Sequence, residues 1–408
     1  MDYPDLFRYL RNTINYEQDV ISTHSSDVYN FTFESKATTL LPGTLNYQCD
    51  EHRLKFALSE ESLKPAIDEN LLMLKSKDIQ IIENKRFRYH VFVPKDKTKA
   101  SGVIFMFHGF NEKKWDKYFP WAESLVKKTG KAVLLFPIAF HMNRAPLLWS
   151  SRYEMFELSK KRISSFPGIQ NSTFPNVAIS IHLQSRPERF IWSGLQTYFD
   201  VIQLVDQIKS GLHPVIERDS SIDFFAYSIG GLLAKILLMA NHKNYFSDSK
   251  LCLFCSGAAF NRVQATSKFI IDSEGSMALY SFLIEHLDYF VRTDSRLAHY
   301  ISDKHPEGLA LYSLLNYHKM TEYRDKKLNE LSKKIMAVGL KKDNVFPYYE
   351  IKNTLHGLDG NIPIKVQILN FDFPYIHEDP FPVNKKYAEE ITRAFEDTFE
   401  LMGNFLKD

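Results

Sequence analysis

The sequence predicts an α/β fold whose central sheet is mostly parallel, and three observations support this prediction. Short, continuous apolar runs such as 103–107 and 132–136 indicate strands that are buried on both faces of a sheet. Helical patterns separate these runs along the chain, and strand, helix and strand in this rhythm are typical of βαβ units. A helical block after residue 259 interrupts the rhythm, which resumes at residue 335.

The elements of this fold are expected in the following order. Residues 1–78 are mostly polar and show no clear pattern, so we expect an N-terminal extension that packs on the core, followed by an α/β domain over 79–408. Strands are expected at 79–93 (one or two), 103–107, 132–136, 222–227, 250–255, 335–339 and 364–371, and helices at about 115–128, 192–208, 228–240, 277–291, 309–317 and 385–405.

Turn and breaker residues set the limits of several of these elements. Pro94 begins a turn after the first strands, Gly130 closes the first helix, and Pro137 ends the strand at 132–136. The helix at 192–208 is justified by apolar residues spaced along one side. By contrast, the stretch 141–190 is rich in Arg, Ser, Pro and Asn, and we expect an irregular excursion over the surface.

The helical block over about 260–330 is heavy in Leu, Tyr and Phe. We interpret it as a cap inserted over the carboxyl edge of the sheet, where ligands bind in such folds. The alternative is that these helices merely lengthen the core. The immediate return of a strand at 335–339 favours the cap.

The composition limits the class of protein. The chain has 408 residues, of which 44% are hydrophobic, and its 51 basic and 49 acidic residues give a net charge of +2. No basic field points to a nucleic acid or a membrane surface. No run approaches the roughly 18 apolar residues of a membrane span, and the N-terminus lacks a secretory signal, so we expect a cytoplasmic protein.

The three cysteines make an odd set that cannot pair fully: Cys49, Cys252 and Cys255. Cys252-x-x-Cys255 has the spacing of a redox motif, but it overlaps the apolar run at 251–254. Residues three apart on a strand point to opposite faces. We therefore interpret these two cysteines as buried structural residues.

The most informative segment is 222–235, which reads as a buried strand, a sharp turn carrying Ser228, and a helix rich in Leu and Ala. This is the context of a nucleophile elbow, in which a strained turn exposes the serine hydroxyl. Ala226 and Gly230 supply the small residues that the close approach of strand and helix requires. A tight βα turn without catalysis is the alternative, because short motifs of this kind also occur by chance.

A serine nucleophile needs a base, an acid that orients the base, and donors for the developing oxyanion. His377 follows the last expected strand and is the candidate base, and Asp343 follows the strand at 335–339 and is the candidate acid. The backbone N–H groups of Phe110, after the His108-Gly109 turn, and of Ile229 are the candidate oxyanion donors. We expect His108 to hold its loop in place rather than transfer protons.

Other residues compete for these roles. His305, His318 and His356 are alternative bases, and Asp359 and Asp372 are alternative acids. A further cluster, Arg186, Arg189 and Trp192, has the chemistry to bind a carboxylate or phosphate, although such a run is more often a solvated helix start with local ion pairs.

Taken together, the His-Gly turn at 108–109, the A-x-S-x-G elbow at 226–230, Asp343 and His377 resemble the α/β-hydrolase superfamily in type and order. The resemblance covers about residue 79 to the end. It implies an eight-stranded, mostly parallel sheet with helices on both faces, and hydrolysis through an acyl-enzyme. Ala226 in place of glycine is a mild departure from the motif.

The expected activity is that of an esterase- or lipase-like serine hydrolase acting on a carboxylic ester or thioester. Its expected partner is a small-molecule acyl substrate, with no cofactor and no metal. An acyltransferase, a peptidase or a carbon–carbon bond hydrolase would use the same triad. A non-catalytic binding protein on the same scaffold is a further alternative. The sequence indicates neither the substrate nor the oligomeric state.

Overall fold

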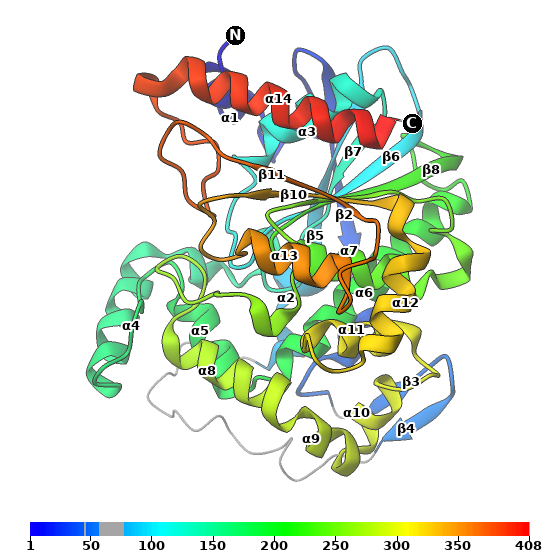
Figure 1. Ribbon diagram of the computed structural model, residues 1–408, viewed down its shortest axis with the longest axis vertical. Coiled ribbons are helices and arrows are strands. Elements are labelled where there is room, and N and C mark those ends of the chain that lie inside the picture. Colours follow the sequence, from blue (N-terminus) through cyan, green and yellow to red (C-terminus); the bar gives the residue numbers. More distant parts are fainter. Residues whose placement is uncertain (45, 57–76, 408) are drawn as a thin grey trace.

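The computed structural model describes residues 1–44, 46–56 and 77–407. In this part of the chain a sheet of nine strands runs in the order β1-β2-β5-β7-β6-β8-β9-β10-β11 (Figure 1). Its strands are β1 (Val20–Ser22), β2 (Ser26–Glu34), β5 (Arg86–Pro94), β6 (Ala100–Phe107), β7 (Ala132–Leu135), β8 (Ile216–Tyr227), β9 (Leu251–Phe254), β10 (Ile335–Leu340) and β11 (Lys365–Leu369). A separate hairpin pairs β3 (Tyr47–Cys49) with β4 (Leu54–Phe56).

The sheet is mostly parallel, as expected. Strands β7, β6, β8, β9, β10 and β11 pair in parallel, whereas β1, β2 and β5 join by antiparallel pairing. The described sheet has one strand more than the eight expected. The sheet also takes in residues 20–34, which lie in the expected N-terminal extension.

Helices cover both faces of the sheet (Figure 1). They are α1 (Tyr3–Thr13), α2 (Ile82–Lys85), α3 (Tyr118–Thr129), α4 (Arg152–Ser165), α5 (Val177–Ser185), α6 (Arg189–Lys209), α7 (Gly230–Ala240), α8 (Ser273–Tyr280), α9 (Leu287–Thr293), α10 (Ser295–Tyr300), α11 (Pro306–Leu315), α12 (Thr321–Glu330), α13 (Tyr348–His356) and α14 (Ala388–Lys407). On one face α1, α3 and α14 pack together, and on the other α6, α7 and α13 contact the strands. The expected mixed α/β fold is therefore confirmed.

The alternation of side chains along the strands divides the hydrophobic core between the two faces. On β8, Phe225 and Tyr227 join the cluster under α3 and α14, and Phe224 and Ala226 join the cluster on the opposite face. All four side chains are buried. The strand that carries the elbow is thus fixed from both sides.

The segment 141–190 differs from the irregular surface excursion that its composition indicated. It contains α4 and α5, and most residues of α5 are buried. Arg162 of α4 makes two hydrogen bonds, of 2.6 and 2.9 Å, to the carboxylate of Asp272, which caps the N-terminus of α8. This buried ion pair fastens the segment to the helices beyond the sheet edge.

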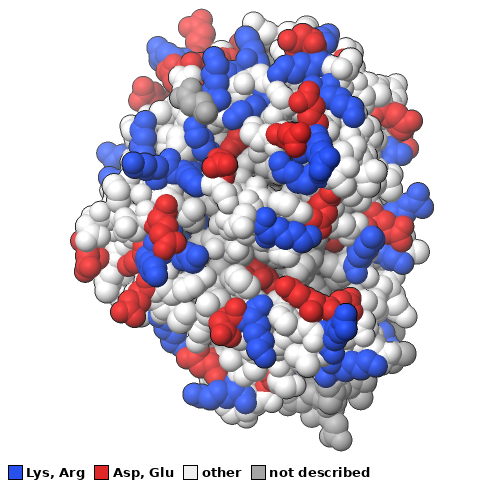
Figure 2. Space-filling model, turned by 90° about the vertical axis from the view of Figure 1, so that its right-hand side faces the viewer, with Lys and Arg blue, Asp and Glu red and all other residues white. Residues whose placement is uncertain are grey.

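The helical block falls at 273–330: in Figure 1 α8 to α11 lie below the sheet, with α4 and α5 at the left, and α12 at the right leads back toward β10. Instead of one helix over 277–291, α8 continues through a π-helical segment at Ser281–His286 into α9. Among the described residues, none of the helices has the length and apolar character needed to cross a membrane. Acidic and basic side chains are interspersed on the face drawn in Figure 2, in keeping with the small net charge.

Candidate active site

The turn between β8 and α7 holds Ser228 in a left-handed backbone conformation, with φ of 55°. Such a conformation is unfavourable for a residue with a side chain and persists only where its surroundings fix it. Here the N–H of Ser228 donates to the carbonyl of Phe254 (3.2 Å), and the hydroxyl of Ser256 donates to the carbonyl of Ser228 (2.6 Å). Strand β9 and the loop after it therefore hold the turn in place.

The space around the turn admits only small side chains. A Cβ on Gly231 would lie 2.1 Å from Ser256 Oγ and 2.7 Å from Leu253 Cδ2. Ala226, where the motif more often has glycine, is fully buried and its methyl group is accommodated. The departure from G-x-S-x-G is thus tolerated in this chain.

The structure brings Ser228, His377 and Asp343 into one hydrogen-bonded chain. Ser228 Oγ lies 2.8 Å from His377 Nε2, and His377 Nδ1 lies 2.8 Å from Asp343 Oδ2. With an ionised carboxylate, Nδ1–H donates to Asp343, and Nε2 is left to accept the serine proton. All three residues are buried.

Asp343 is held by more than the imidazole. Its Oδ1 accepts the backbone N–H groups of Val345 (2.8 Å) and Phe346 (2.9 Å), in the loop that follows β10. Both carboxylate oxygens therefore have partners, which fixes the direction in which Oδ2 faces His377.

His377 lies in an aromatic setting. The rings of Tyr227 and Phe346 are nearly parallel to the imidazole, with centroids 5.3 and 5.6 Å away. The Tyr227 hydroxyl also donates a hydrogen bond to the backbone carbonyl of His377. The last residue of β8 thus positions the loop that carries the imidazole.

Cys255 stands next to this group, which the sequence pattern did not indicate. One donor atom each of Cys255, Asp343 and His377 lie within 4.8 Å of one another. Residue 255 has φ of 47°, so the strand alternation ends there, and Cys255 packs in the same cluster as Cys252 rather than on the opposite face. Both cysteines are buried and unpaired, and burial raises the pKa of each thiol well above its usual value.

Phe110 and Ile229, the expected oxyanion donors, both line the pocket that contains Ser228. Within the described part of the chain, the backbone N–H of neither residue donates a hydrogen bond. His108 does hold its loop: Nδ1–H donates to the carbonyl of Gly109 (2.7 Å), and Nε2 accepts the N–H of Ile138 (2.9 Å). Burial lowers the pKa of His108 well below its usual value, so this imidazole is neutral.

The pocket over Ser228, counted together with the open space at its mouth, measures about 610 Å³ and has no charged side chain in its wall. The helices and loops beyond the sheet edge supply much of its apolar lining, including Phe260, Val263, Ile271 and Leu279. A second pocket, of about 650 Å³ with its open mouth included, adjoins the first one, and Phe110, Phe190 and Ile229 line both. The two pockets together are lined mainly by apolar side chains, and Ser228 lines the first of them.

None of the competing residues joins this group. His305 lies in a different cluster, His318 accepts from Arg262, His356 bonds the carbonyl of Ile364, and Asp359 and Asp372 are exposed. The arginine cluster is engaged internally as well: Arg186 pairs with Glu188, Arg189 with Asp78 at 2.7 Å, and Trp192 stacks beneath Arg296.

The fold and this geometry define a mixed α/β protein in which a histidine is hydrogen-bonded to a serine on one side and to an aspartate on the other. The chain belongs to a family of unknown function, DUF6051, whose sequence profile matches residues 1–407. No curated protein matches the chain.

Several solved structures are similar in fold at low sequence identity. Carboxyl esterase 2 from the mycorrhizal fungus Tuber melanosporum has a TM-score of 0.43 and 13% identity, covering 79% of this chain and 83% of that one. A thermostable esterase from Pseudomonas putida ECU1011 has a TM-score of 0.43 and 9% identity, covering 99% and 90%. A cold-adapted esterase from an Arctic intertidal metagenomic library has a TM-score of 0.38 and 10% identity, covering 95% and 99%.

Proposed function

We propose that this protein is a serine hydrolase that cleaves a carboxylic ester or thioester through an acyl-enzyme. The observation that carries the proposal is the pair of 2.8 Å contacts that join Ser228 Oγ to His377 Nε2, and His377 Nδ1 to Asp343 Oδ2. A base within hydrogen-bond reach of a serine and itself oriented by a carboxylate is the arrangement that activates a hydroxyl.

In the first half of the proposed reaction, Ser228 Oγ attacks the acyl carbon while its proton passes to His377 Nε2. The carbonyl oxygen becomes an oxyanion, which the N–H groups of Phe110 and Ile229 stabilise. Asp343 keeps the imidazole in the correct tautomer and stabilises the imidazolium. The intermediate then collapses to an acyl-serine, and His377 returns the proton to the departing alcohol or thiol.

In the second half, His377 takes a proton from water, whose oxygen attacks the acyl carbon. Collapse of this second intermediate breaks the bond to Ser228 Oγ, which regains its proton, and releases the carboxylic acid. The uncharged, apolar wall of the pocket supports an acyl or aromatic group without a charge as the part of the substrate next to the serine.

Labelling with a fluorophosphonate, followed by intact-mass measurement, tests the activated serine. Ser276 also lines the pocket but has no histidine partner among the described contacts, so Ser276→Ala is the matched control for Ser228→Ala. We expect one adduct on the wild type and on Ser276→Ala, and none on Ser228→Ala. Hydrolysis of a p-nitrophenyl ester should fall by about 10⁴-fold or more in Ser228→Ala.

Three results would contradict the proposal. An adduct retained by folded Ser228→Ala would place the reactive serine elsewhere. A wild type that stays unlabelled and inert toward esters and thioesters, with the circular dichroism of a folded protein, would favour a non-catalytic binding protein. The third result is activity without ester or thioester hydrolysis. Cleavage of an amide would then assign the triad to a peptidase, and transfer of an acyl group to an acceptor other than water would assign it to an acyltransferase.

A further inference from the structure

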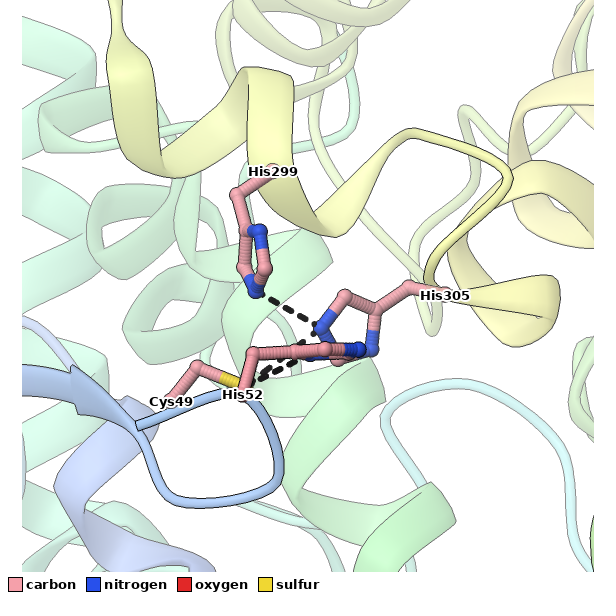
Figure 3. Close-up of side chains that lie close together, drawn as sticks. All are labelled: Cys49, His52, His299 and His305. Carbon is pink, nitrogen blue, oxygen red and sulfur yellow. Dashed lines mark hydrogen bonds between the residues drawn. The ribbon is translucent and has the colours of Figure 1, made fainter. Parts of the chain in front are cut away.

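A second group of chemically active side chains lies away from the serine, between the β3–β4 hairpin and the helical block. Cys49 is the last residue of β3, and His52 is in the turn that follows it. His299 is on α10, and His305 immediately precedes α11. About 250 residues of sequence separate the two halves of the group, which nevertheless face one another (Figure 3).

The four side chains direct one donor atom each toward a common centre. Cys49 Sγ lies 3.4 Å from His52 Nδ1 and 3.5 Å from His305 Nε2, and His305 Nε2 lies 3.0 Å from His299 Nε2 (Figure 3). All four donor atoms fall within 4.8 Å of one another. Zn–N bonds of 2.0–2.1 Å and a Zn–S bond of 2.3 Å, arranged tetrahedrally, separate the ligand atoms by about 3.3–3.6 Å.

The second ring nitrogen of His305 has a carboxylate as its hydrogen-bond partner, as is common for histidines that bind zinc. Nδ1 of His305 lies 2.7 Å from Oε1 of Glu307, and both side chains are buried. An ionised carboxylate requires Nδ1 to carry the proton, which leaves the lone pair of Nε2 directed at Cys49 and His299. A carboxylate that orients a metal-binding histidine in this way recurs in zinc sites.

We propose that Cys49, His52, His299 and His305 bind one Zn²⁺ ion. Three imidazoles and a thiolate, without an oxygen ligand, form a donor set that suits zinc. Four protein ligands complete a tetrahedral shell, so the ion has a structural role. The contacts from the thiol to nitrogen, at 3.4 and 3.5 Å, are weak hydrogen bonds, whereas coordination would make use of all four convergent atoms.

The ion would fasten the β3–β4 hairpin to α10 and to the start of α11. Helix α11 also carries Glu307 and Leu311, which line the pocket adjoining Phe110 and Ile229. A zinc ion at this place would therefore fix one wall of the apolar space near the proposed catalytic serine. The zinc proposal does not depend on the hydrolase proposal.

Metal analysis of the purified full-length chain by mass spectrometry tests the site. After chelation and reloading with Zn²⁺ alone, we expect about one zinc per chain in the wild type. Cys49→Ser and His299→Gln should lose that zinc. His286→Gln, which alters an exposed histidine of the same helical block, should keep it. Glu307→Gln should bind zinc about 10–100-fold more weakly.

Two further measurements locate the metal. Co²⁺ loaded in place of zinc should give a thiolate charge-transfer band that Cys49→Ser abolishes. Among the described residues, Cys255, Asp343 and His377 form the other group of convergent donors. Asp343→Asn should therefore keep the zinc at full stoichiometry.

Two kinds of result would contradict the zinc proposal. A folded wild type that binds no zinc after reloading excludes the site, whether or not the variants fold. Zinc retained by both Cys49→Ser and His299→Gln, or lost from Asp343→Asn alone, would place the ion elsewhere. These measurements do not involve catalysis. A failure of the zinc proposal can therefore be distinguished from a failure of the hydrolase proposal, which the labelling of Ser228 tests.

Discussion

A Cβ placed on Gly230 would stand 2.8 Å from the carbonyl oxygen of His108. It would also meet Phe107 Cβ at 2.8 Å, so the first turn of α7 lies directly against the end of β6. This approach sets the distance between the loop that carries Phe110 and the turn that carries Ile229. The two proposed oxyanion donors therefore depend on the absence of a side chain at Gly230.

Gly230→Ala should therefore damage both the fold and the activity. Overpacking of this kind costs about 1–3 kcal/mol of unfolding free energy, and displacement of either N–H should slow turnover by about 10²-fold. Urea denaturation and ester hydrolysis measure the two effects.

Gly194→Ala is the control for stability, because a Cβ there meets no atom within 4 Å and the residue lies inside α6. It should be neutral or stabilising by about 0.5–1 kcal/mol. Equal stability of Gly230→Ala and the wild type would contradict the proposed close packing.

Asp343→Asn tests whether the carboxylate acts through the tautomer of His377. An amide in place of Oδ2 favours the wrong tautomer, so we expect kcat to fall by about 10³–10⁴-fold while KM changes little. Ester hydrolysis and the rate of fluorophosphonate labelling both report the loss.

The exposed alternative acid provides the matched control. Asp372→Asn should leave both rates unchanged. If Asp372→Asn were as slow as Asp343→Asn, or if Asp343→Asn kept its rate, the assignment of the acid would be wrong.

The residues brought together at the serine could be found from sequence because each follows a strand of a parallel sheet. Parallel strands end at the same edge, so the residues after β8 and β10 and in the loop beyond β11 converge without any further information. Their chemical roles stay predictions, since proximity alone does not establish catalysis.

Strand β2, by contrast, is not predicted by the sequence pattern. Its residues Ser26–Glu34 alternate between buried and partly exposed positions, and polar residues fill several of them. The segment therefore lacks the continuous apolar run that marks a strand buried on both faces. Its place in the sheet depends on antiparallel pairing with β5, which is a tertiary contact.

The cysteine and histidine cluster could not be predicted from spacing either. Cys49 and His52 lie in a short turn, but their partners are about 250 residues away, at His299 and His305. A site that forms only when a hairpin packs on helices distant in the sequence leaves no short sequence motif by which to predict it. His305, an alternative base for the serine on the sequence alone, lies in this group instead.

Acid should destabilise the fold through buried, neutral histidines. Burial lowers the pKa of His213 to about 4, from an ordinary value of 6.5, and its Nε2 lies 3.1 Å from the Tyr89 hydroxyl. Below pH 6.5 the unfolded chain binds a proton that folded His213 does not bind until about pH 4. Stability is therefore lost as pH falls through this window, by about 2 kcal/mol between pH 7 and pH 5.

His213→Gln removes this one contribution, so its unfolding free energy should fall by about 2 kcal/mol less than that of the wild type between pH 7 and pH 5. Urea denaturation at several pH values measures the difference. His90 and His141, whose pKa values burial also lowers, to about 3 and about 4, retain their share of the acid sensitivity in both proteins. The exposed control His286→Gln should follow the wild-type curve. Parallel curves for His213→Gln and the wild type would mean that His213 gains its proton as readily in the fold as in the unfolded chain.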